Sequence, residues 1–335
     1  MQIIQSRREF LASASLAATA GVLGTRAPLA AVPPPETTRI RVKRSAAICF
    51  APAYVADALL RAEGFTEIEY VDAGLGIPSG EMLARGELDF DITFAGTVVH
   101  HLDLGRPVTA IGGLHGGCYE VFAHEPIRAI SDLKGRRVGV HALRSSSHLY
   151  LSVMAAHVGL DPHNDIEWTT SPDGGALDRF VAGESDAFIG FPPEPQEIRA
   201  RGVDRVILNT ITDRPWSQYI CCMIYGNRAW IRNHPVATKR YLRAVYKAAA
   251  FCAADPEGAA RQLVDRGFAE RYDYALETIK DVKYDLWHEY DAEDTLRFFA
   301  LRLYEVGMIT STPNQILADG TDWRFLNELK RELKV

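Results

Sequence analysis

Long hydrophobic runs are missing from this 335-residue sequence. The longest weakly polar run, residues 11–24, is rich in Ser, Thr and Ala and falls short of the roughly 20 mostly apolar residues of a membrane-spanning helix. The sequence therefore predicts no integral membrane domain. A basic block is missing too, because 37 Lys and Arg stand against 43 Asp and Glu, a net charge of −6. This balance argues against nucleic acid as the main partner.

Cysteine is scarce and shows none of the spacings of a metal or disulfide framework. The five cysteines are odd in number and include no Cys-x-x-Cys, so neither a zinc knuckle nor a disulfide set is indicated. We interpret the adjacent pair Cys221-Cys222 as small apolar residues of a buried strand, with a redox role as the alternative. No two histidines have the i, i+4 spacing of a helical zinc site, so no metal site is predicted. His115, His141 and His148 are better candidates for neutral hydrogen-bonding groups that face a ligand.

What is present indicates a folded α/β protein. The chain is 47% hydrophobic and 24% charged, close to the average of soluble globular proteins, which excludes a disordered tail, a collagen-like fibre and a coiled coil. Its length suits about two domains. Catalytic motifs such as Gly-x-Ser-x-Gly, His-Glu-x-x-His and the Walker loop do not occur.

The N-terminus resembles a twin-arginine export signal. Residues 6–12 read Ser-Arg-Arg-Glu-Phe-Leu-Ala and precede a mild apolar stretch and the small residues Ala27, Ala30 and Ala31. We expect residues 1–31 to be a signal peptide, with an N-terminal amphipathic helix as the alternative. Its removal takes away three Arg and one Glu, so the mature charge becomes −6 − 2 = −8. This route implies a periplasmic protein that folds before export, and free buried thiols are then expected.

Short apolar runs alternate with helical patterns along the mature chain, which predicts parallel α/β sheets. Strands are expected over 40–42, 67–71, 90–94, 108–114, 120–123, 137–140, 165–169, 187–191, 205–209 and 219–225. Helices are expected over 53–62, 78–84, 98–104, 148–157, 175–181 and 194–200, and then over 229–253, 256–266, 270–286 and 291–306.

One segment recurs. Residues 86–94 and 183–191 both read Gly-Glu-x-Asp followed by an apolar strand. The spacing predicts a helix that ends at a left-handed glycine and turns into a buried strand. Two such units favour two similar α/β lobes, with chance similarity of a common turn as the alternative.

Four segments in order resemble the nitrate, sulfonate and taurine-type substrate-binding proteins of ABC importers, a superfamily that also includes binders of thiamine-pyrimidine precursors. The resemblance covers about residues 38–310. Its motifs are Cys-Phe-Ala-Pro-Ala at 49–53, Leu83-x-x-Gly86-x-x-Asp89-x-x-Ile92 leading to 95–97, Asp-Leu-Lys-Gly at 132–135 followed by Ser145–Ser147, and Asp-Ala-Phe-Ile-Gly-Phe-Pro-Pro-Glu-Pro at 186–195. Many members have Trp-Glu-Pro where this chain has Phe191-Pro192-Pro193-Glu194-Pro195, and this departure leaves a flat heterocycle or aromatic acid open as the ligand.

The resemblance implies a type II periplasmic binding protein fold with two α/β lobes, a ligand cleft and a helical C-terminal region. Lobe 1 would be discontinuous, residues 38–121 plus 219–335, and lobe 2 would be residues 122–218. The expected partners are a small-molecule ligand and an inner-membrane ABC permease. We expect a monomer that needs neither a cofactor nor nucleic acid.

Ligands of such sheets bind beyond the carboxyl ends of strands, where helix N-termini offer free N–H groups. The Ser run at 145–147 could cradle a sulfonate or carboxylate with help from Arg144, or it could simply cap a helix. Aromatic residues there could stack on a flat ligand or fill the core. The glycine-rich stretch 112–117 indicates a cleft wall or hinge. The predicted ligand-binding residues are Phe50, Ala51, Ala95, Gly96, Thr97, His115, Arg144, Ser145, Ser146, Ser147, Phe191 and Trp216.

Three functions remain open on the sequence. The leading prediction is a periplasmic substrate-binding component that closes on an anionic sulfonate or carboxylate and delivers it to the permease. The second is an enzyme like the relative that makes the thiamine pyrimidine, which uses an active-site His and a Lys-bound cofactor. The third is a periplasmic ligand sensor that docks on a receptor.

Overall fold

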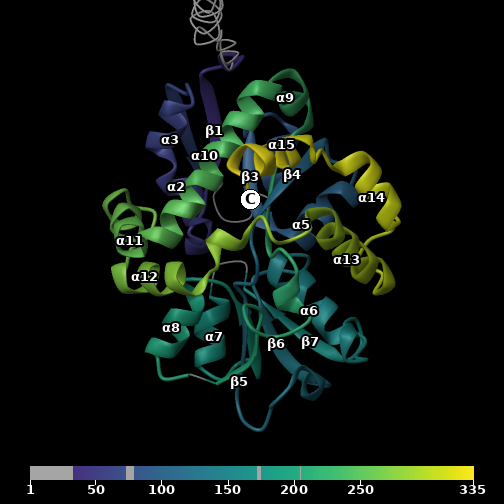
Figure 1. The fold of residues 1–335 in the computed structure, drawn as a ribbon. Coiled ribbons are helices and arrows are strands. Elements are labelled where there is room, and N and C mark those ends of the chain that lie inside the picture. Colours follow the sequence, from purple (N-terminus) through teal and green to yellow (C-terminus); the bar gives the residue numbers. More distant parts are fainter. Residues whose placement is uncertain (1–32, 73–78, 172–174, 204) are drawn as a thin grey trace, which may run out of the picture. The chain divides into compact units, whose positions relative to one another are not determined.

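The computed structural model describes residues 33–72, 79–171, 175–203 and 205–335. The expected twin-arginine segment lies outside these residues. Two five-stranded sheets form the framework (Figure 1), and every strand predicted from the sequence is present within a few residues. This confirms the predicted α/β class.

The first sheet has the order β2-β1-β3-β10-β4. Strands β1, β2 and β3 run parallel, whereas β10 runs antiparallel to both β3 and β4. The carboxyl ends of β1, β3 and β4 therefore share one edge with the start of β10. The strands are β1 (Arg39–Arg44), β2 (Glu67–Asp72), β3 (Phe90–Phe94), β4 (Val108–His115) and β10 (Cys222–Asn227).

The second sheet repeats this plan with the order β7-β6-β8-β5-β9. Here β5 runs antiparallel to β8 and β9. The expectation of purely parallel sheets was wrong at β5 and β10, because each enters its sheet from the other one without the helical crossover that parallel pairing requires. The strands are β5 (Glu120–Ala123), β6 (Arg136–Val140), β7 (Ile166–Thr170), β8 (Ala187–Gly190) and β9 (Val206–Asn209).

The repeated Gly-Glu-x-Asp segment builds the same corner in both sheets. Gly86 and Gly183 have φ of 70° and 76°, the left-handed values expected after a helix. In the first sheet Asp89 Oδ2 accepts from the backbone N–H of Arg41 at 2.7 Å. In the second, Asp186 Oδ2 accepts from the backbone N–H of Arg137 at 2.8 Å. The side chain of each arginine also forms an ion pair with the same aspartate. In each sheet, one aspartate therefore holds two neighbouring strands in register.

Helices cover both sheets, and α6, α7 and α8 lie with the second (Figure 1). The predicted helix 229–253 is two helices, because Pro235 starts a new helix at its first position. The helices and 3₁₀ turns up to the second crossover are η1 (Ile48–Phe50), α2 (Ala51–Val55), α3 (Asp57–Ala62), α4 (Ser79–Ala84), α5 (Ala95–Asp103), η2 (Ile130–Leu133), α6 (Ser146–His157), α7 (Ala176–Val181), α8 (Glu194–Ala200) and η3 (Trp216–Gln218).

The C-terminal region is helical, as expected. Helix α10 contacts α2, α3, α11 and α15, and so ties the C-terminal helices to the start of the chain. In the described part of the chain, none of the helices is both long and apolar enough to span a membrane. The C-terminal elements are α9 (Arg228–Asn233), α10 (Pro235–Ala254), α11 (Pro256–Asp265), α12 (Tyr272–Asp281), η4 (Tyr284–Leu286), α13 (Ala292–Glu305), α14 (Pro313–Gly320) and α15 (Arg324–Leu333).

Two crossovers join the sheets. The first, residues 116–119, links β4 to β5, and the second, residues 210–221, links β9 to β10. The two crossovers are in contact through their backbones at Gly117 and Thr210. A Cβ atom on residue 117 would lie 2.0 Å from the carbonyl oxygen of Thr210. Only glycine fits at this crossing. The lobe boundaries stay a prediction, and β5 (Glu120–Ala123) spans the predicted boundary after residue 121.

Candidate ligand-binding site

A cavity of about 460 Å³, lined mostly by polar and charged residues, lies where the ends of the two sheets meet. Lys43 and Thr93 reach it from β1 and β3, and Thr97 from the first turn of α5. The loop between β6 and α6 closes the opposite side. The lining residues are Lys43, Ser79, Thr93, Thr97, His100, His101, Leu104, Arg106, Ala142, Leu143, Arg144, Ser145 and Ser146.

The lining of this cavity is basic and hydroxyl-rich, and among the described residues no acidic side chain lines it. Lys43 Nζ lies 3.9 Å from Asp91, and Arg106 pairs with Glu81 at 2.9 Å. Arg144 is exposed and forms no ion pair within the described residues. A bound anion could therefore pair with the Arg144 guanidinium without displacing a carboxylate of the protein.

Arg144 also has an unusual backbone, with φ of 64°. A non-glycine residue rarely adopts this left-handed conformation, and such residues gather at functional loops. The loop is held by Arg144 N–H, which donates to His148 Nδ1 at 3.1 Å. The sequence could not show this strain, because nothing in the residue type predicts it.

The three serines after Arg144 have different roles. Ser145 is the N-cap of α6, and its Oγ accepts from the backbone N–H of His148. Ser147 is fully buried, and its Oγ lies 3.0 Å from His141 Nδ1. Ser146 lines the cavity. The capping interpretation therefore describes Ser145, while the ligand-facing interpretation applies best to Ser146.

Several buried polar atoms of the lining residues have no hydrogen-bond partner among the described residues. They are Thr97 Oγ1, His100 Nδ1, both ring nitrogens of His101 and Arg106 Nη1. Burial and the positive charge of Arg106 lower the pKa of His101 to about 3, so this ring is neutral. Burial likewise lowers the pKa of His100. Unpaired buried polar groups cost free energy, which a ligand with polar atoms would recover.

A second, smaller cavity of about 120 Å³ adjoins the first and shares Lys43, Thr93 and Ser146 with it. Its wall is largely aromatic and sulfur-containing. The lining residues are Lys43, Ser45, Ala47, Cys49, Phe50, Ile92, Thr93, Phe94, Cys118, Tyr119, Ser146, Phe191 and Cys222. The rings of Tyr119 and Phe191 meet edge to face, with centroids 5.3 Å apart. The two cavities together suit a molecule with an anionic head and a small apolar part.

Six of the predicted site residues line one or both of these cavities: Phe50, Thr97, Arg144, Ser145, Ser146 and Phe191. The others lie elsewhere. Ala51 and Ala95 are fully buried, and Gly96 packs against the ring of Phe94. Trp216 is buried beside Tyr150 and Phe298. The binding role of each stays a prediction.

Sequence reasoning missed Lys43, Thr93 and Tyr119. Lys43 follows the predicted strand 40–42 directly, so its position at a carboxyl end was a usable signal. Tyr119 lies in the first crossover and reaches the cavity only because the two sheets meet there. His115, predicted as a ligand-facing group, is buried away from the larger cavity and close to three cysteines.

Two mixed sheets joined by two crossovers, with a polar cavity at their ends, define the periplasmic binding protein class of fold. The chain belongs to the NMT1/THI5-like family, whose sequence pattern it matches over residues 50–259. This confirms the resemblance seen in the sequence. No curated protein matches the chain by sequence.

Solved structures share the fold at low sequence identity. The periplasmic nitrate-binding protein NrtA from Synechocystis PCC 6803 is 17% identical, with a TM-score of 0.74 over 90% of this chain and 91% of that one. The alkanesulfonate-binding protein SsuA from Xanthomonas axonopodis pv. citri, bound to MOPS, is 16% identical, with a TM-score of 0.70 over 86% and 99%. The SsuA of Escherichia coli, described as a periplasmic aliphatic sulphonate binding protein, is 19% identical, with a TM-score of 0.66 over 83% and 91%.

Proposed function

We propose that this protein is the periplasmic substrate-binding component of an ABC importer and that it captures a small organic anion, a sulfonate or a carboxylate. The observation that carries the proposal is the larger cavity, which combines Lys43, Arg106 and Arg144 with five hydroxyl side chains and no acidic lining residue. Solved proteins of the same fold are described as binding nitrate and sulfonates. The negative net charge of the chain does not attract an anion, so the preference is local.

The two cavities divide the ligand between them in this proposal. The anionic head lies between Lys43 and Arg144 and accepts hydrogen bonds from Thr97 and Ser146, which lie in the first turns of α5 and α6. The apolar part enters the smaller cavity beside Phe191. Charge-assisted hydrogen bonds hold the head more strongly than neutral ones would.

Release and delivery require the cleft to open. The expected moving bodies are residues 38–121 with 219–335, and residues 122–218, which swing about the two crossovers. A ligand that contacts both bodies stabilises the closed form through its higher affinity for that form. The permease then recognises the closed protein. The twin-arginine pattern at residues 6–12 supports export before any of this happens.

A thermal-shift screen of the mature chain, from about residue 32, tests the ligand class. Each anion is compared with a neutral analogue of the same shape, so alkyl and aryl sulfonates stand beside sulfonamides and aromatic carboxylates beside carboxamides. At 100 times its dissociation constant a ligand stabilises by about 2.7 kcal/mol, which raises the melting temperature by roughly 5–10 °C. We expect a shift from one class of organic anion and none from its neutral analogue.

Other results contradict the proposal in identifiable ways. Equal shifts from the anion and its neutral analogue would contradict anion recognition, and a shift from nitrate alone would contradict an organic ligand. A pyrimidine that shifts the protein together with visible absorption by bound pyridoxal phosphate would favour the enzyme alternative. Binding without a neighbouring permease gene would favour the sensor.

A further inference from the structure

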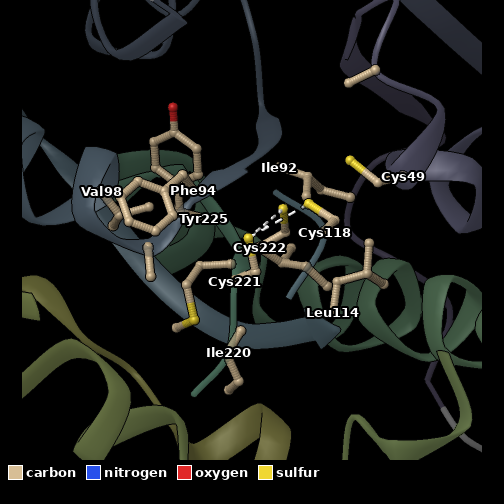
Figure 2. Close-up of a cluster of buried hydrophobic side chains, with 14 of the residues drawn as sticks. Cys49, Ile92, Phe94, Val98, Leu114, Cys118, Ile220, Cys221, Cys222 and Tyr225 are labelled. Atoms are coloured by element: carbon tan, nitrogen blue, oxygen red, sulfur yellow. Dashed lines mark hydrogen bonds between the residues drawn. The ribbon is translucent and has the colours of Figure 1, made fainter. Parts of the chain in front are cut away.

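Three thiols and one imidazole converge at the edge of the first sheet. Their possible ligand atoms, on Cys49, His115, Cys118 and Cys222, all lie within 4.8 Å of one another. Each of the four residues is at most 2% exposed. They come from η1, the end of β4, the first crossover and the start of β10. His115 and Cys118 are three residues apart, whereas Cys49 and Cys222 are distant from them in the sequence. Figure 2 shows the side chains of Cys118, Cys221 and Cys222 close together, with Cys49 to one side of them.

The imidazole of His115 is oriented as a metal ligand would be. Its Nδ1 lies 2.6 Å from the carbonyl oxygen of Gly116, and a carbonyl only accepts, so Nδ1 carries the proton. Nε2 is then left with a lone pair, and it is buried at a position where no described residue meets the geometric criteria of a hydrogen bond to it. A ligating histidine commonly donates its other ring N–H to a backbone carbonyl in this way.

We propose that Cys49, His115, Cys118 and Cys222 bind one zinc ion in a tetrahedral Cys₃His site. A zinc ion with Zn–S bonds of about 2.3 Å holds its sulfurs roughly 3.8 Å apart, a spacing that atoms within 4.8 Å of one another reach by small side-chain rotations. Three thiolates and a neutral imidazole are a soft donor set that favours zinc over calcium or magnesium. All four positions are supplied by the protein, as in structural zinc sites.

The strongest rival is a disulfide. Cys221 Sγ lies 3.5 Å from Cys118 Sγ and 3.9 Å from Cys222 Sγ (Figure 2). A bond between Cys118 and Cys221 would remove one of the four zinc ligands, so the two states exclude each other. The geometry favours zinc because zinc would bind the lone pair of the buried Nε2 of His115, which a Cys118–Cys221 disulfide leaves unused.

The zinc ion would fix the hinge region to the first sheet. Cys118 belongs to the first crossover, and Cys222 comes directly after the second, so one ion ties both connections to β4 and η1. Cys49, Cys118 and Cys222 also line the smaller cavity. The zinc site would therefore make one wall of the smaller cavity rigid, whatever molecule binds there. This inference does not depend on the proposed function.

The test begins with the metal content of the mature protein purified without added metal. Elemental analysis should find about one zinc ion per chain, and this zinc content should fall severalfold in Cys118→Ser and Cys222→Ser. Cys252→Ser is the matched control, because Cys252 is equally buried but lies in α10 outside the cluster. It should keep its zinc.

X-ray absorption at the zinc edge of the unmodified protein covers the case in which the serine variants fail to fold. It should show three sulfur neighbours and one nitrogen. A chain without metal, a Cys118–Cys221 disulfide found by mass spectrometry of blocked peptides, or a zinc shell of oxygen and nitrogen alone would each overturn the proposal. Copper(I) in place of zinc would overturn the choice of ion.

Discussion

The contact between the two crossovers offers a sharp test of the structure at the hinge. Thr210 is fully buried, and its Oγ1 accepts from the backbone N–H of Tyr119 at 2.8 Å. The same Oγ1 donates to the Tyr119 carbonyl at 3.0 Å, which also accepts from Thr210 N–H at 2.9 Å. Thr210→Val keeps the shape of the side chain and removes only this hydroxyl.

The expected loss follows from which groups are left unpaired. The Tyr119 carbonyl keeps its bond from Thr210 N–H, but Tyr119 N–H becomes a buried donor without a partner. Such a group costs about 1–3 kcal/mol. Since 1 kcal/mol corresponds to roughly 2–4 °C in a protein somewhat smaller than this one, the melting temperature should fall by about 2–10 °C.

Differential scanning calorimetry measures this fall, and two variants control it. Thr278→Val removes an equally buried hydroxyl whose only bond is to the carbonyl of Tyr274 in its own helix, so it leaves no backbone N–H unpaired. Thr210→Ser restores the hydroxyl. If Thr210→Val destabilises no more than Thr278→Val, the described contact between the crossovers is refuted.

Three further predictions concern the cleft. Arg144→Gly removes the strain of a left-handed backbone at a non-glycine residue, so it should raise the unfolding free energy by roughly 0.5–1 kcal/mol. The same substitution should weaken anion binding. A loss of stability in urea denaturation would contradict the inference that the backbone at Arg144 is strained. Burial lowers the pKa of His141, but the Glu194 carboxylate at 2.6 Å raises it more, to a net value above 6.5. The stability due to this pair is therefore full below about pH 6.5 and is lost as the pH rises through the folded pKa. The difference in unfolding free energy between wild type and His141→Gln should therefore shrink as the pH rises above about 6.5, and a constant difference would contradict the pairing. Tyr225→Phe removes the hydroxyl that donates to buried Asp91 at 2.9 Å and should cost about 1–3 kcal/mol in the same assay, and a neutral result would contradict that bond.

The strands were predictable because buried strands are short apolar runs bounded by turns. The corner at Gly86 was predictable for a local reason, the need for a left-handed residue between helix and strand. The direction of β10 was not, because it depends on which sheet the chain enters after residue 221. The break between α9 and α10 could have been predicted from Pro235, because proline favours the first position of a new helix. The helical periodicity on both sides of it obscured this signal.

Only the site residues that directly follow a single strand were predictable from the sequence. Arg144 and Ser146 follow a strand end and lie at the cavity as expected. Lys43 and Tyr119 meet them only through the arrangement of the sheets. The cluster around His115 is the extreme case, because Cys49 and Cys222 are distant in the sequence from His115 and Cys118. The pairing of β10 with β4 places Cys222 opposite His115, and only the fold brings Cys49 to them.

The most direct test of the central claim is a calorimetric titration of the mature protein with the organic anion that gives the largest thermal shift. Lys43→Gln removes the lysine shared by both cavities, and Lys280→Gln removes an exposed lysine that likewise pairs with a carboxylate. A charge-assisted hydrogen bond contributes about 1.5–3 kcal/mol, so the account predicts one-to-one binding that Lys43→Gln weakens at least about tenfold and Lys280→Gln leaves unchanged. Equal affinity in Lys43→Gln and wild type would contradict it.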